Sequence, residues 1–390
     1  MRRIFGINCA CDPTEFFTML SPQRVDTVLL KIRAREAGRH LGNVYSTTRG
    51  HENMRVILTL PKLSGPKFGN PALLSWLDYS IHFLCILTML PWLLIFYNTF
   101  IFICPPFFDT VTASIMRLFK MKVVIVVTDA WVEQAKSSLE MAGKKMTSLT
   151  RFKLGVGRAF EIFAAKSANE IFVVSKFLFD LNRGWSDKVF FIPNGADVGN
   201  IEQLPQKRMF DRPTIVYLGG FEQWRGVDLL VDAYKLVRDK TRAKLLLIGG
   251  GPDLERVKKY AGDHPGIKFT GYLKHDEAIS YVKGADVAVM PARDCLAART
   301  VSSIKCFEYI ACETPAIVTD SGEHAYWTKK YNTGIVVKDT PEAIADGILR
   351  LLNNKNLYEA TKENCRNHKW DVDFKRTRKI YVKKLQEQAS

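Results

Sequence analysis

The fold is decided by a stretch that reads Val287-Ala-Val-Met290, then Ser302-Ser-Ile-Lys-Cys-Phe-Glu-Tyr-Ile-Ala-Cys312, then Glu313-Thr-Pro-Ala-Ile-Val-Thr319. The first run and the last four residues are short, apolar and rich in β-branched side chains, which predicts buried strands. The middle run is long enough for a helix, and Pro315 interrupts the chain just before the second strand. Strand, helix and strand in this order predict two parallel strands of one sheet.

The same alternation continues through the rest of the second half. Further strands are predicted at Thr214–Leu218, Lys244–Ile248 and Ile267–Thr270. Helical patterns lie between and after them, at Val227–Asp239, Asp253–Ala261, Asp276–Gly284 and Pro341–Leu352. Strands that alternate with helices predict a parallel sheet covered by helices on both faces.

The first half shows the same pattern less regularly. Its predicted strands are Arg3–Ile7, Met54–Leu60, Thr99–Cys104, Lys122–Thr128 and Ile171–Val174. Its predicted helices lie at about Arg24–Arg39, Val111–Phe119 and Arg158–Ala168. The chain is therefore expected to be an α/β protein of two Rossmann-like, doubly wound domains, with a ligand cleft between them at the carboxyl ends of the strands.

The domain boundaries follow from this pattern. We expect a first domain at residues 1–195 and a second at residues 196–370. Residues 371–390 are expected to form a C-terminal helix that returns to the first domain. With 390 residues, the chain is long enough for each domain to bury a core of its own.

The start of the predicted helix at Ser302 suits an anion. Ser302 and Ser303 carry hydroxyls that can cap a helix, and the remaining N–H groups and the positive dipole end favour a diphosphate. Glu308 follows among apolar neighbours, where a carboxylate is costly to bury unless it accepts hydrogen bonds. A vicinal diol, as on ribose, would satisfy it; a surface glutamate is the other interpretation.

This segment closely resembles the donor-binding helix of family-4 glycosyltransferases, which have the GT-B fold. Glu308 and Pro315 match the family's pattern, in which the Glu holds the ribose of a nucleotide sugar. The resemblance implies transfer with retention of anomeric configuration and no required metal or other cofactor. The donor-binding residues expected in this segment are Ser302, Ser303, Ile304, Lys305 and Glu308.

Shorter segments extend the resemblance over most of the chain. The segment Tyr217–Gly226 is similar to the family's phosphate-binding stretch, and Arg225 keeps a fork of donors for phosphate there. The segment Ile192–Asp197 resembles the interdomain turn, and its Pro and Asn-Gly also suit a hinge. Further donor contacts are expected at Gly219, Gly220, Gly250, Tyr272 and Leu273, the last two in a segment whose backbone commonly contacts the base.

Two positions depart from the family's pattern. Thr300 stands eight residues before Glu308, where many members carry a first Glu that contacts the donor sugar. Gly220 stands where an Arg usually helps to hold the phosphates, and Lys305 is a candidate substitute for that charge. The nucleotide end of the donor is therefore well marked in the sequence, whereas the identity of the sugar is not.

Asp129 is the acceptor-side candidate in the first half. It belongs to the segment Thr128–Glu133, which with Cys104-Pro105-Pro106 is similar to a subgroup that has a DxW motif after an apolar helix. Asp129 would orient the acceptor or stabilise positive charge at the anomeric carbon, so we assign it, with Arg225, to catalysis. A helix N-cap is the alternative role for Asp129.

An apolar run precedes that motif. Tyr79 to Phe108 contains no Asp, Glu, Lys or Arg, and Pro91 and Asn98 divide it. We predict an apolar helix near residues 79–97, followed by a buried strand. The helix can lie on a bilayer, cross it, or be buried in the core, and many members of the similar subgroup take part in membrane-linked glycan assembly.

Charge and cysteine content limit the partners. The net charge of +16 is denser in the first half, where residues 1–190 hold 24 Lys and Arg against 14 Asp and Glu. Such a surplus suits an anionic bilayer or a phosphorylated substrate, or is a solvated surface. No zinc finger, homeodomain-like helix or aromatic-basic RNA motif is found, so nucleic acid is not expected. Scattered cysteines without a signal peptide predict reduced thiols and a cytoplasmic protein at the membrane's inner face.

The sequence therefore predicts a membrane-associated, retaining glycosyltransferase of the hexosyltransferase type. It would move a sugar from a nucleotide-diphosphate sugar to a hydroxyl of a lipid-linked or membrane-proximal glycan. Two alternatives remain open at this point. One is a GT-B nucleotide-sugar epimerase or phosphorylase. The other is an inactive membrane-docked subunit, which Thr300 in place of the family's Glu and Gly220 in place of its Arg make possible.

Overall fold

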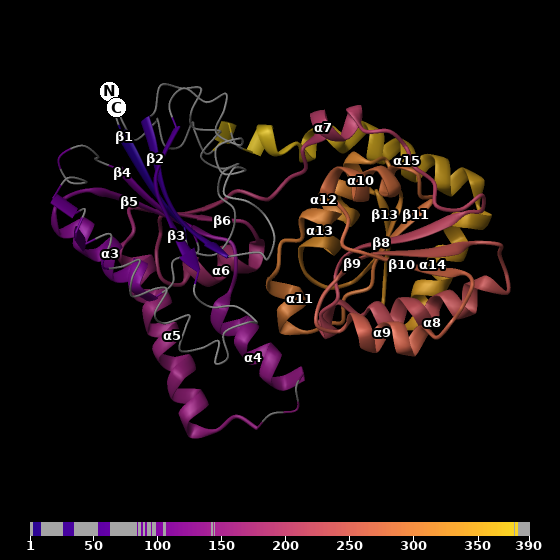
Figure 1. Cartoon of the computed structure of the whole chain (residues 1–390), viewed down its shortest axis with the longest axis horizontal. Coiled ribbons are helices and arrows are strands. Elements are labelled where there is room, and N and C mark those ends of the chain that lie inside the picture. The colour runs from indigo at the N-terminus through magenta and orange to yellow at the C-terminus, as the bar shows by residue number, and fades with distance from the viewer. Residues whose placement is uncertain are drawn as a thin grey trace. The chain divides into compact units, whose positions relative to one another are not determined.

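The protein is described here from a computed structural model (Figure 1). It describes residues 3–8, 26–34, 54–62, 99–103, 107–141, 143, 145–377 and 379–380, together with residues 84, 87, 88, 90, 91 and 95. The chain divides into two compact units. The first consists mainly of residues before Ile192, and the second runs from Pro193 onward and also includes residues 133–145.

The first unit is built on a parallel sheet. Its strands run in the order β3-β2-β1-β4-β5-β6-β7, and each neighbouring pair is parallel. The strands are β1 (Arg3–Asn8), β2 (Asp26–Ala34), β3 (Met54–Lys62), β4 (Thr99–Ile103), β5 (Lys122–Val127), β6 (Glu170–Val173) and β7 (Val189–Phe191). Apart from its last strand, this is the strand order of a dinucleotide-binding fold.

The helix predicted at Arg24–Arg39 is wrong. The structure has strand β2 there, paired with β1 on one side and β3 on the other. The strand contains the β-branched residues Thr27, Val28 and Ile32, which favour a pleated strand over a helix. A strand inside a parallel sheet is apolar on both faces, so hydrophobic periodicity does not distinguish it from a short helix.

Helices and a buried core complete the first unit. The described helices of this unit are α3 (Phe107–Leu118), α5 (Ser148–Ser167) and α6 (Lys176–Arg183), whereas α4 (Trp131–Met141) belongs to the second unit from Glu133 onward. The core contains fully buried side chains from the central strands, such as Phe100, Val123 and Ile171. Ala164 and Ala165 near the end of α5 pack on this core, so α5 is anchored by its C-terminal half.

The apolar run is described in part. The predicted strand is confirmed as β4, in which Phe100, Ile101 and Phe102 are fully buried. Most of the predicted apolar helix near residues 79–97 lies outside the described residues. Of those that are described, Leu90 packs partly against the core, whereas Leu84 and Ile95 are exposed. Within the described ranges, no helix combines the length and the apolar character needed to cross a bilayer.

The second unit has its own parallel sheet, in the order β10-β9-β8-β11-β12-β13. The strands are β8 (Thr214–Gly220), β9 (Lys244–Gly250), β10 (Ile267–Gly271), β11 (Val287–Met290), β12 (Ala316–Thr319) and β13 (Gly334–Val337). When the strands of this sheet are numbered from 1 along the chain, their order is 3-2-1-4-5-6. Successive strands are therefore added in one direction from β8 to β10 and in the opposite direction from β11 onward, so the order reverses between β8 and β11. In such sheets, ligands bind beyond the carboxyl ends of the strands at this switch point.

Helices cover both faces of the second sheet (Figure 1). Helices α8 (Val227–Arg238), α9 (Leu254–Ala261) and α14 (Pro341–Asn353) pack on one face around fully buried residues such as Leu230, Leu247 and Ile348. The remaining helices are α7 (Val198–Gln203), α10 (His275–Lys283), α11 (Leu296–Thr300), α12 (Ile304–Ala311), α13 (Gly322–Tyr331) and α15 (Lys355–His368). The predicted doubly wound α/β fold is confirmed for this unit.

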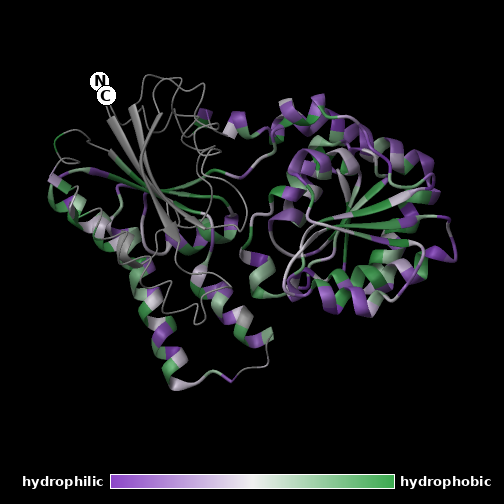
Figure 2. Cartoon of the chain, viewed as in Figure 1, coloured by the Kyte–Doolittle hydropathy of each residue, from purple (hydrophilic) through white to green (hydrophobic). Residues whose placement is uncertain are grey.

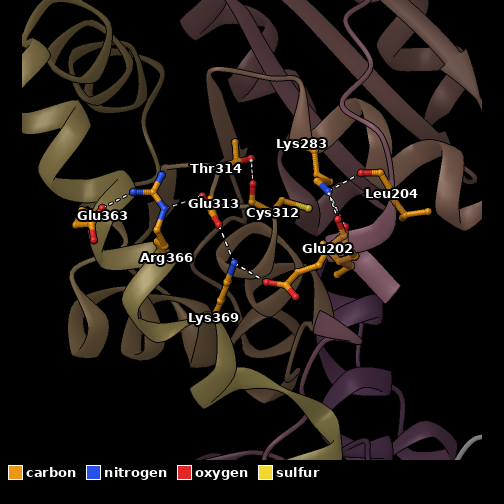
Figure 3. Close-up of polar contacts among 10 residues, drawn as sticks. Glu202, Leu204, Lys283, Cys312, Glu313, Thr314, Glu363, Arg366 and Lys369 are labelled. Atoms are coloured by element: carbon orange, nitrogen blue, oxygen red, sulfur yellow. Dashed lines mark hydrogen bonds and ion pairs between the residues drawn. The ribbon is translucent and has the colours of Figure 1, made fainter. Parts of the chain in front are cut away.

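Ion pairs and hydrogen bonds connect α7 with the end of α10 and with the turn after α12 (Figure 3). Lys369 Nζ lies 2.7 Å from Glu202 and 2.9 Å from Glu313, and so connects the end of α7 to the turn after α12. Lys283 Nζ donates to the carbonyls of Ile201 and Glu202 nearby. These contacts fix the C-terminal end of α12 and therefore the position of its N-terminal end.

The turn predicted as a hinge is bonded within the second unit. Ala196 N donates to Val372 O at 2.9 Å, and Phe374 N donates back to Ala196 O at 3.0 Å. A Cβ on Gly195 would lie 2.6 Å from Val372 O, so only glycine allows this close approach. Residues after Asn194 are therefore part of the second unit rather than a free linker.

Candidate functional site

A pocket lies at the switch point of the second sheet. It is lined by residues in and just after the carboxyl ends of β8 and β11, by residues at the start of α12, and by residues of α11 and α13. These residues are Tyr217, Leu218, Trp224, Arg225, Met290, Pro291, Ala292, Ala298, Val301, Ser303, Lys305 and His324. The sequence predicts Arg225, Ser303 and Lys305 as donor-binding residues, and the structure brings these three together.

The N-terminus of α12 has two unsatisfied hydroxyls. Ser302 and Ser303 are 7% and 9% exposed, and neither Oγ has a hydrogen-bond partner among the residues that the structure describes. Ser303 is the N-cap residue, but its side chain makes no capping bond, so the predicted hydroxyl cap is wrong. An unmade bond of a buried hydroxyl costs about 1–3 kcal/mol, which a ligand that accepts a hydrogen bond would recover.

The same residues are held by the preceding turn. Asn194 Nδ2 donates to the carbonyl of Ser302 at 2.9 Å. The first N–H groups of α12 have no partner inside the helix, and with the positive dipole end they suit an anion. Ile304, the first helical residue, is 49% exposed, so this helix end is accessible.

Lys305 lies against β8. A Cβ built on Gly219 would be 2.7 Å from Lys305 Cε, so glycine at this position leaves room for the lysine. Burial, with the nearby positive charge of Arg225, lowers the pKa of Lys305 to about 8. Because burial disfavours the charged form of this amine, an anion bound beside it would stabilise the positive charge. Lys305 therefore supplies positive charge close to where Gly220 lacks it.

Arg225 is already paired. It ends the short 3-10 helix Gln223–Arg225, forms an ion pair with Glu222, and stacks on Trp224 at 4.2 Å from the ring centroid. The Glu222 carboxylate in turn occupies the space beside Gly220, where a Cβ would lie 2.5 Å from its oxygen. A dianionic ligand would compete with Glu222 for this guanidinium.

Glu308 has a partner that the sequence analysis missed. The carboxylate is 7% exposed, and its Oε1 lies 2.7 Å from His275 Nε2, at the start of α10. The hydrogen bond to Glu308 raises the pKa of His275 above its ordinary value. His275 therefore holds one carboxylate oxygen in place. Its position two residues after Leu273 in the chain is the signal that could have drawn attention to it.

The expected base-contacting residues lie at the ends of β9 and β10. A Cβ on Gly250 would be 2.7 Å from the ring of Tyr272, so the ring covers this glycine. Tyr272 is 80% exposed and Leu273 is half-buried. The neighbouring Gly249 has a φ of 121°, and a Cβ there would lie 2.0 Å from Gly219 O, so glycine is needed for β8 and β9 to end side by side.

Thr300, which stands where many members of the similar family carry a Glu, bonds within its own helix. Thr300 is fully buried at the end of α11, and its Oγ1 donates to Ala297 O at 3.0 Å.

His324 is a further buried group that lines the pocket, and burial lowers its pKa to about 4. His324 therefore stays neutral at physiological pH, and Lys305 and Arg225 supply the pocket's positive charge.

Asp129 belongs to the first unit. It lies in the loop between β5 and α4, beyond the carboxyl end of its strand, and is half-buried. Its Oδ2 accepts a hydrogen bond from Thr128 Oγ1 at 3.0 Å. This is the position expected for a residue that faces a ligand at the carboxyl edge of a parallel sheet.

We expect the affinity of the pocket for a nucleoside diphosphate to fall as pH rises above about 8, because Lys305 loses its proton there. An anion raises the lysine pKa, so binding at pH 8.5 should take up a proton. Calorimetry in buffers of different ionisation enthalpy measures this uptake. Lys305→Met should bind more weakly at pH 7 and show a flatter profile. An equally steep profile in the variant would remove Lys305 from the pocket's chemistry.

Residues 200–368 match the family described as "Glycosyl transferases group 1". An uncharacterized glycosyltransferase of Methanocaldococcus jannaschii is 28% identical over 248 residues, which cover 59% of each chain. A GDP-mannose-dependent alpha-(1-6)-phosphatidylinositol monomannoside mannosyltransferase of Mycobacterium tuberculosis is 31% identical over 43% of this chain and 47% of its own length. The chain thus matches about half to three-fifths of these relatives.

Solved structures show the same fold. Sucrose-phosphate synthase from Thermosynechococcus elongatus has a TM-score of 0.73 at 16% identity, over 100% of this chain and 99% of that one. An Anabaena protein in complex with UDP-glucose has a TM-score of 0.67 at 12% identity, over the whole of both chains. The likeness confirms the predicted GT-B fold.

Proposed function

We propose, from the match of residues 200–368 to the glycosyl transferases group 1 family, that this protein is a retaining glycosyltransferase of the hexosyltransferase type. It transfers a sugar from a nucleotide-diphosphate sugar to a hydroxyl of a lipid-linked or membrane-proximal glycan. The observation that carries the proposal is the start of α12. Two buried, unsatisfied hydroxyls there adjoin a lysine and an arginine at the switch point of a Rossmann-like sheet.

The donor diphosphate is placed at this helix end. The free N–H groups of α12 and the hydroxyls of Ser302 and Ser303 donate to its oxygens, which satisfies both serines. Lys305 and Arg225 lie on the same pocket wall and neutralise the remaining charge. No metal is required in this arrangement, because the chain itself supplies the positive charge.

The nucleoside extends from the diphosphate toward β10. Glu308 accepts hydrogen bonds from the ribose diol through the oxygen that His275 leaves available. The base lies by the backbone of Tyr272 and Leu273, next to Gly250 and the exposed Tyr272 ring that covers this glycine. Support for this placement comes from the close approach of α10 and α12 through the His275–Glu308 bond.

Transfer proceeds by departure of the nucleoside diphosphate as the acceptor hydroxyl approaches the anomeric carbon on the same face. The C–O bond to the diphosphate breaks, a new C–O bond to the acceptor forms, and the hydroxyl proton passes to a phosphate oxygen. Arg225 and Lys305 stabilise the charge that grows on the leaving group. Asp129 stabilises the positive charge at the sugar or orients the acceptor.

The acceptor class follows from three observations. The first half carries most of the net positive charge, and an apolar run lies near residues 79–97. A relative named for a phosphatidylinositol mannoside substrate is 31% identical over its aligned residues. These support an acceptor at the surface of a membrane and a peripheral location on its cytoplasmic face.

Asp129→Asn is expected to lower turnover about tenfold, which corresponds to about 1.4 kcal/mol from one charge interaction in a half-exposed site. Donor affinity should change much less, because Asp129 belongs to the unit without the donor pocket. Steady-state kinetics and donor titration measure the two effects separately. Equal losses in both, with a lower Tm, would instead assign Asp129 to helix capping.

A nucleotide-sugar panel tests the proposed function. One or more nucleotide sugars should raise the melting temperature of the protein, because a ligand that binds the native state stabilises it. The best donor should then yield a product of unchanged anomeric configuration by proton NMR. Binding without transfer and without donor hydrolysis would favour an inactive docked subunit. Thr300 and Gly220, which stand where the similar family usually has a Glu and an Arg, are the residues that motivate this alternative. Release of an epimerised sugar without any acceptor would favour an epimerase.

A further inference from the structure

The N-terminal half of α5 has an exposed apolar face. Leu149 and Phe152 are 63% and 69% exposed, and Phe163, about one turn before the helix end, is 47% exposed. Every residue from 148 to 157 is exposed or half-buried, whereas Ala164 and Ala165 are buried in the core. The helix is therefore anchored at one end and presents its other end to its surroundings.

The apolar residues share one side of this helix. Leu149, Phe152, Val156, Ala159 and Phe163 follow one another at spacings of three and four residues. At 3.6 residues per turn, they form a stripe about 21 Å long, roughly opposite Ala164 and Ala165. Figure 2 shows hydrophobic and hydrophilic residues alternating around α5. Large apolar side chains aligned on an exposed face mark a surface that contacts another apolar phase.

Basic residues flank this stripe. Arg151 and Lys153 are exposed, and no acidic residue occurs between Met141 and Phe160. The first turn of α5 contains no acidic residue, although acids are the residues that stabilise a helix N-terminus. Arg151 and Lys153 lie within two turns of the N-terminus of α5, where the positive end of the helix dipole repels them and the helix is destabilised. An anionic partner would offset this repulsion.

We infer that the α5 face, defined by Leu149, Phe152, Val156, Ala159 and Phe163 with the flanking Arg151 and Lys153, docks on an anionic phospholipid bilayer. The apolar stripe enters the boundary between headgroups and acyl chains, and the basic side chains meet lipid phosphates. A nucleic acid would satisfy the charges but offers no apolar phase for Leu149 and Phe152. The inference rests on the proposed function, because docking would bring the enzyme to a membrane-proximal acceptor.

Vesicle flotation with the full chain tests the inference. The wild type should bind vesicles of phosphatidylcholine with 30% phosphatidylglycerol, and bind pure phosphatidylcholine at least tenfold more weakly. The double variant Leu149→Ser and Phe152→Ser should lose at least tenfold in binding to the anionic vesicles. The variant Arg151→Gln and Lys153→Gln should lose the preference for anionic lipid and much of the salt dependence.

A matched control uses exposed apolar residues of the second unit. Leu236 on α8 and Tyr260 on α9 are 43% and 46% exposed, so Leu236→Ser and Tyr260→Ser remove comparable surface elsewhere. This control should bind vesicles like the wild type. Circular dichroism and the melting temperature establish that each variant is folded.

The inference would be overturned if Leu149→Ser and Phe152→Ser left vesicle binding unchanged, or if the control variant lost as much. It would also fail if a 20-base-pair DNA duplex displaced the protein from vesicles and bound the double variant as tightly as the wild type. Donor binding, measured by thermal shift, is a separate readout in the second unit. Vesicle binding without any donor response would keep the docking face and reject the proposed function.

Discussion

Replacing Arg225 by Met is expected to lower the rate of sugar transfer about 10²–10³-fold, which corresponds to about 3–4 kcal/mol of lost transition-state stabilisation. Arg225 lines the pocket beside Lys305, and the leaving diphosphate gains negative charge as its bond to the sugar breaks. The guanidinium now pairs with Glu222, so part of its interaction with the donor replaces an existing ion pair. The main loss should therefore appear in kcat, where the extra charge develops.

A second arginine of the same unit provides the control. Arg256 on α9 pairs with Asp253 at 2.6 Å and does not line the pocket. Arg256→Met removes the same charge and a similar side chain, and should leave transfer within about twofold of the wild type, as expected for an exposed ion pair. Similar losses in both variants would show that Arg225 acts through general electrostatics or stability rather than on the leaving group.

Glu308→Gln is expected to weaken binding of the nucleotide sugar by about 1–3 kcal/mol, or roughly 5- to 150-fold. The substitution keeps the shape of the side chain but removes the charge that strengthens a hydrogen bond to a ribose hydroxyl. Free nucleoside diphosphate should lose as much as the intact donor, because the contact is to the ribose. Calorimetric titration of both ligands measures the effect.

His275→Gln tests how much the contact with His275 contributes to holding the Glu308 carboxylate in place. His275 contacts Glu308 on the other oxygen and touches the ligand only through it, so the loss in affinity should be smaller than for Glu308→Gln. The pKa of His275 is raised by this bond, so its stabilisation is present at low pH and fades as pH rises through the folded-state pKa. The wild type and His275→Gln should therefore converge in affinity at high pH. Unchanged affinity in Glu308→Gln at every pH would remove Glu308 from the donor site.

The second unit could be predicted closely from the sequence. The bounds of β11 and β12 agree with the predicted strands residue for residue, because each is a short apolar run between turn-forming or helical residues. Helix α13 and strand β13 were not predicted. Helix α13 buries Glu323, His324 and Trp327 and has no regular apolar face, so its sequence lacks the 3.6-residue period.

The first unit was harder to predict for a related reason. A strand covered on both faces, such as β2, has no alternation that would separate it from a helix, and the interpretation depends on neighbours far away in the chain. Helix α5 shows the reverse case. Its predicted N-terminus at Arg158 is ten residues late, although Leu149, Phe152 and Val156 already follow the 3.6-residue period in the first turns.

The candidate site shows what sequence can and cannot provide. Glu308, Lys305 and Arg225 were identified from local motifs, and the structure brings Lys305 and Arg225 to one pocket wall. His275 was missed because its bond to Glu308 joins residues 33 positions apart. The two serines were expected to cap α12, whereas their hydroxyls are buried and have no hydrogen-bond partner in the part of the chain that the structure describes. That difference strengthens their assignment to a ligand.

The central claim is that a nucleotide sugar binds at the N-terminus of α12, at the switch point of the second sheet. Hydrogen–deuterium exchange, with and without the donor that gives the largest thermal shift, tests it most directly. The account predicts slower exchange in peptides that contain residues 218–226 and 302–309, and little change in β12 and α14. Protection confined to other segments, with exchange at residues 302–309 unaffected by a saturating donor, would contradict it.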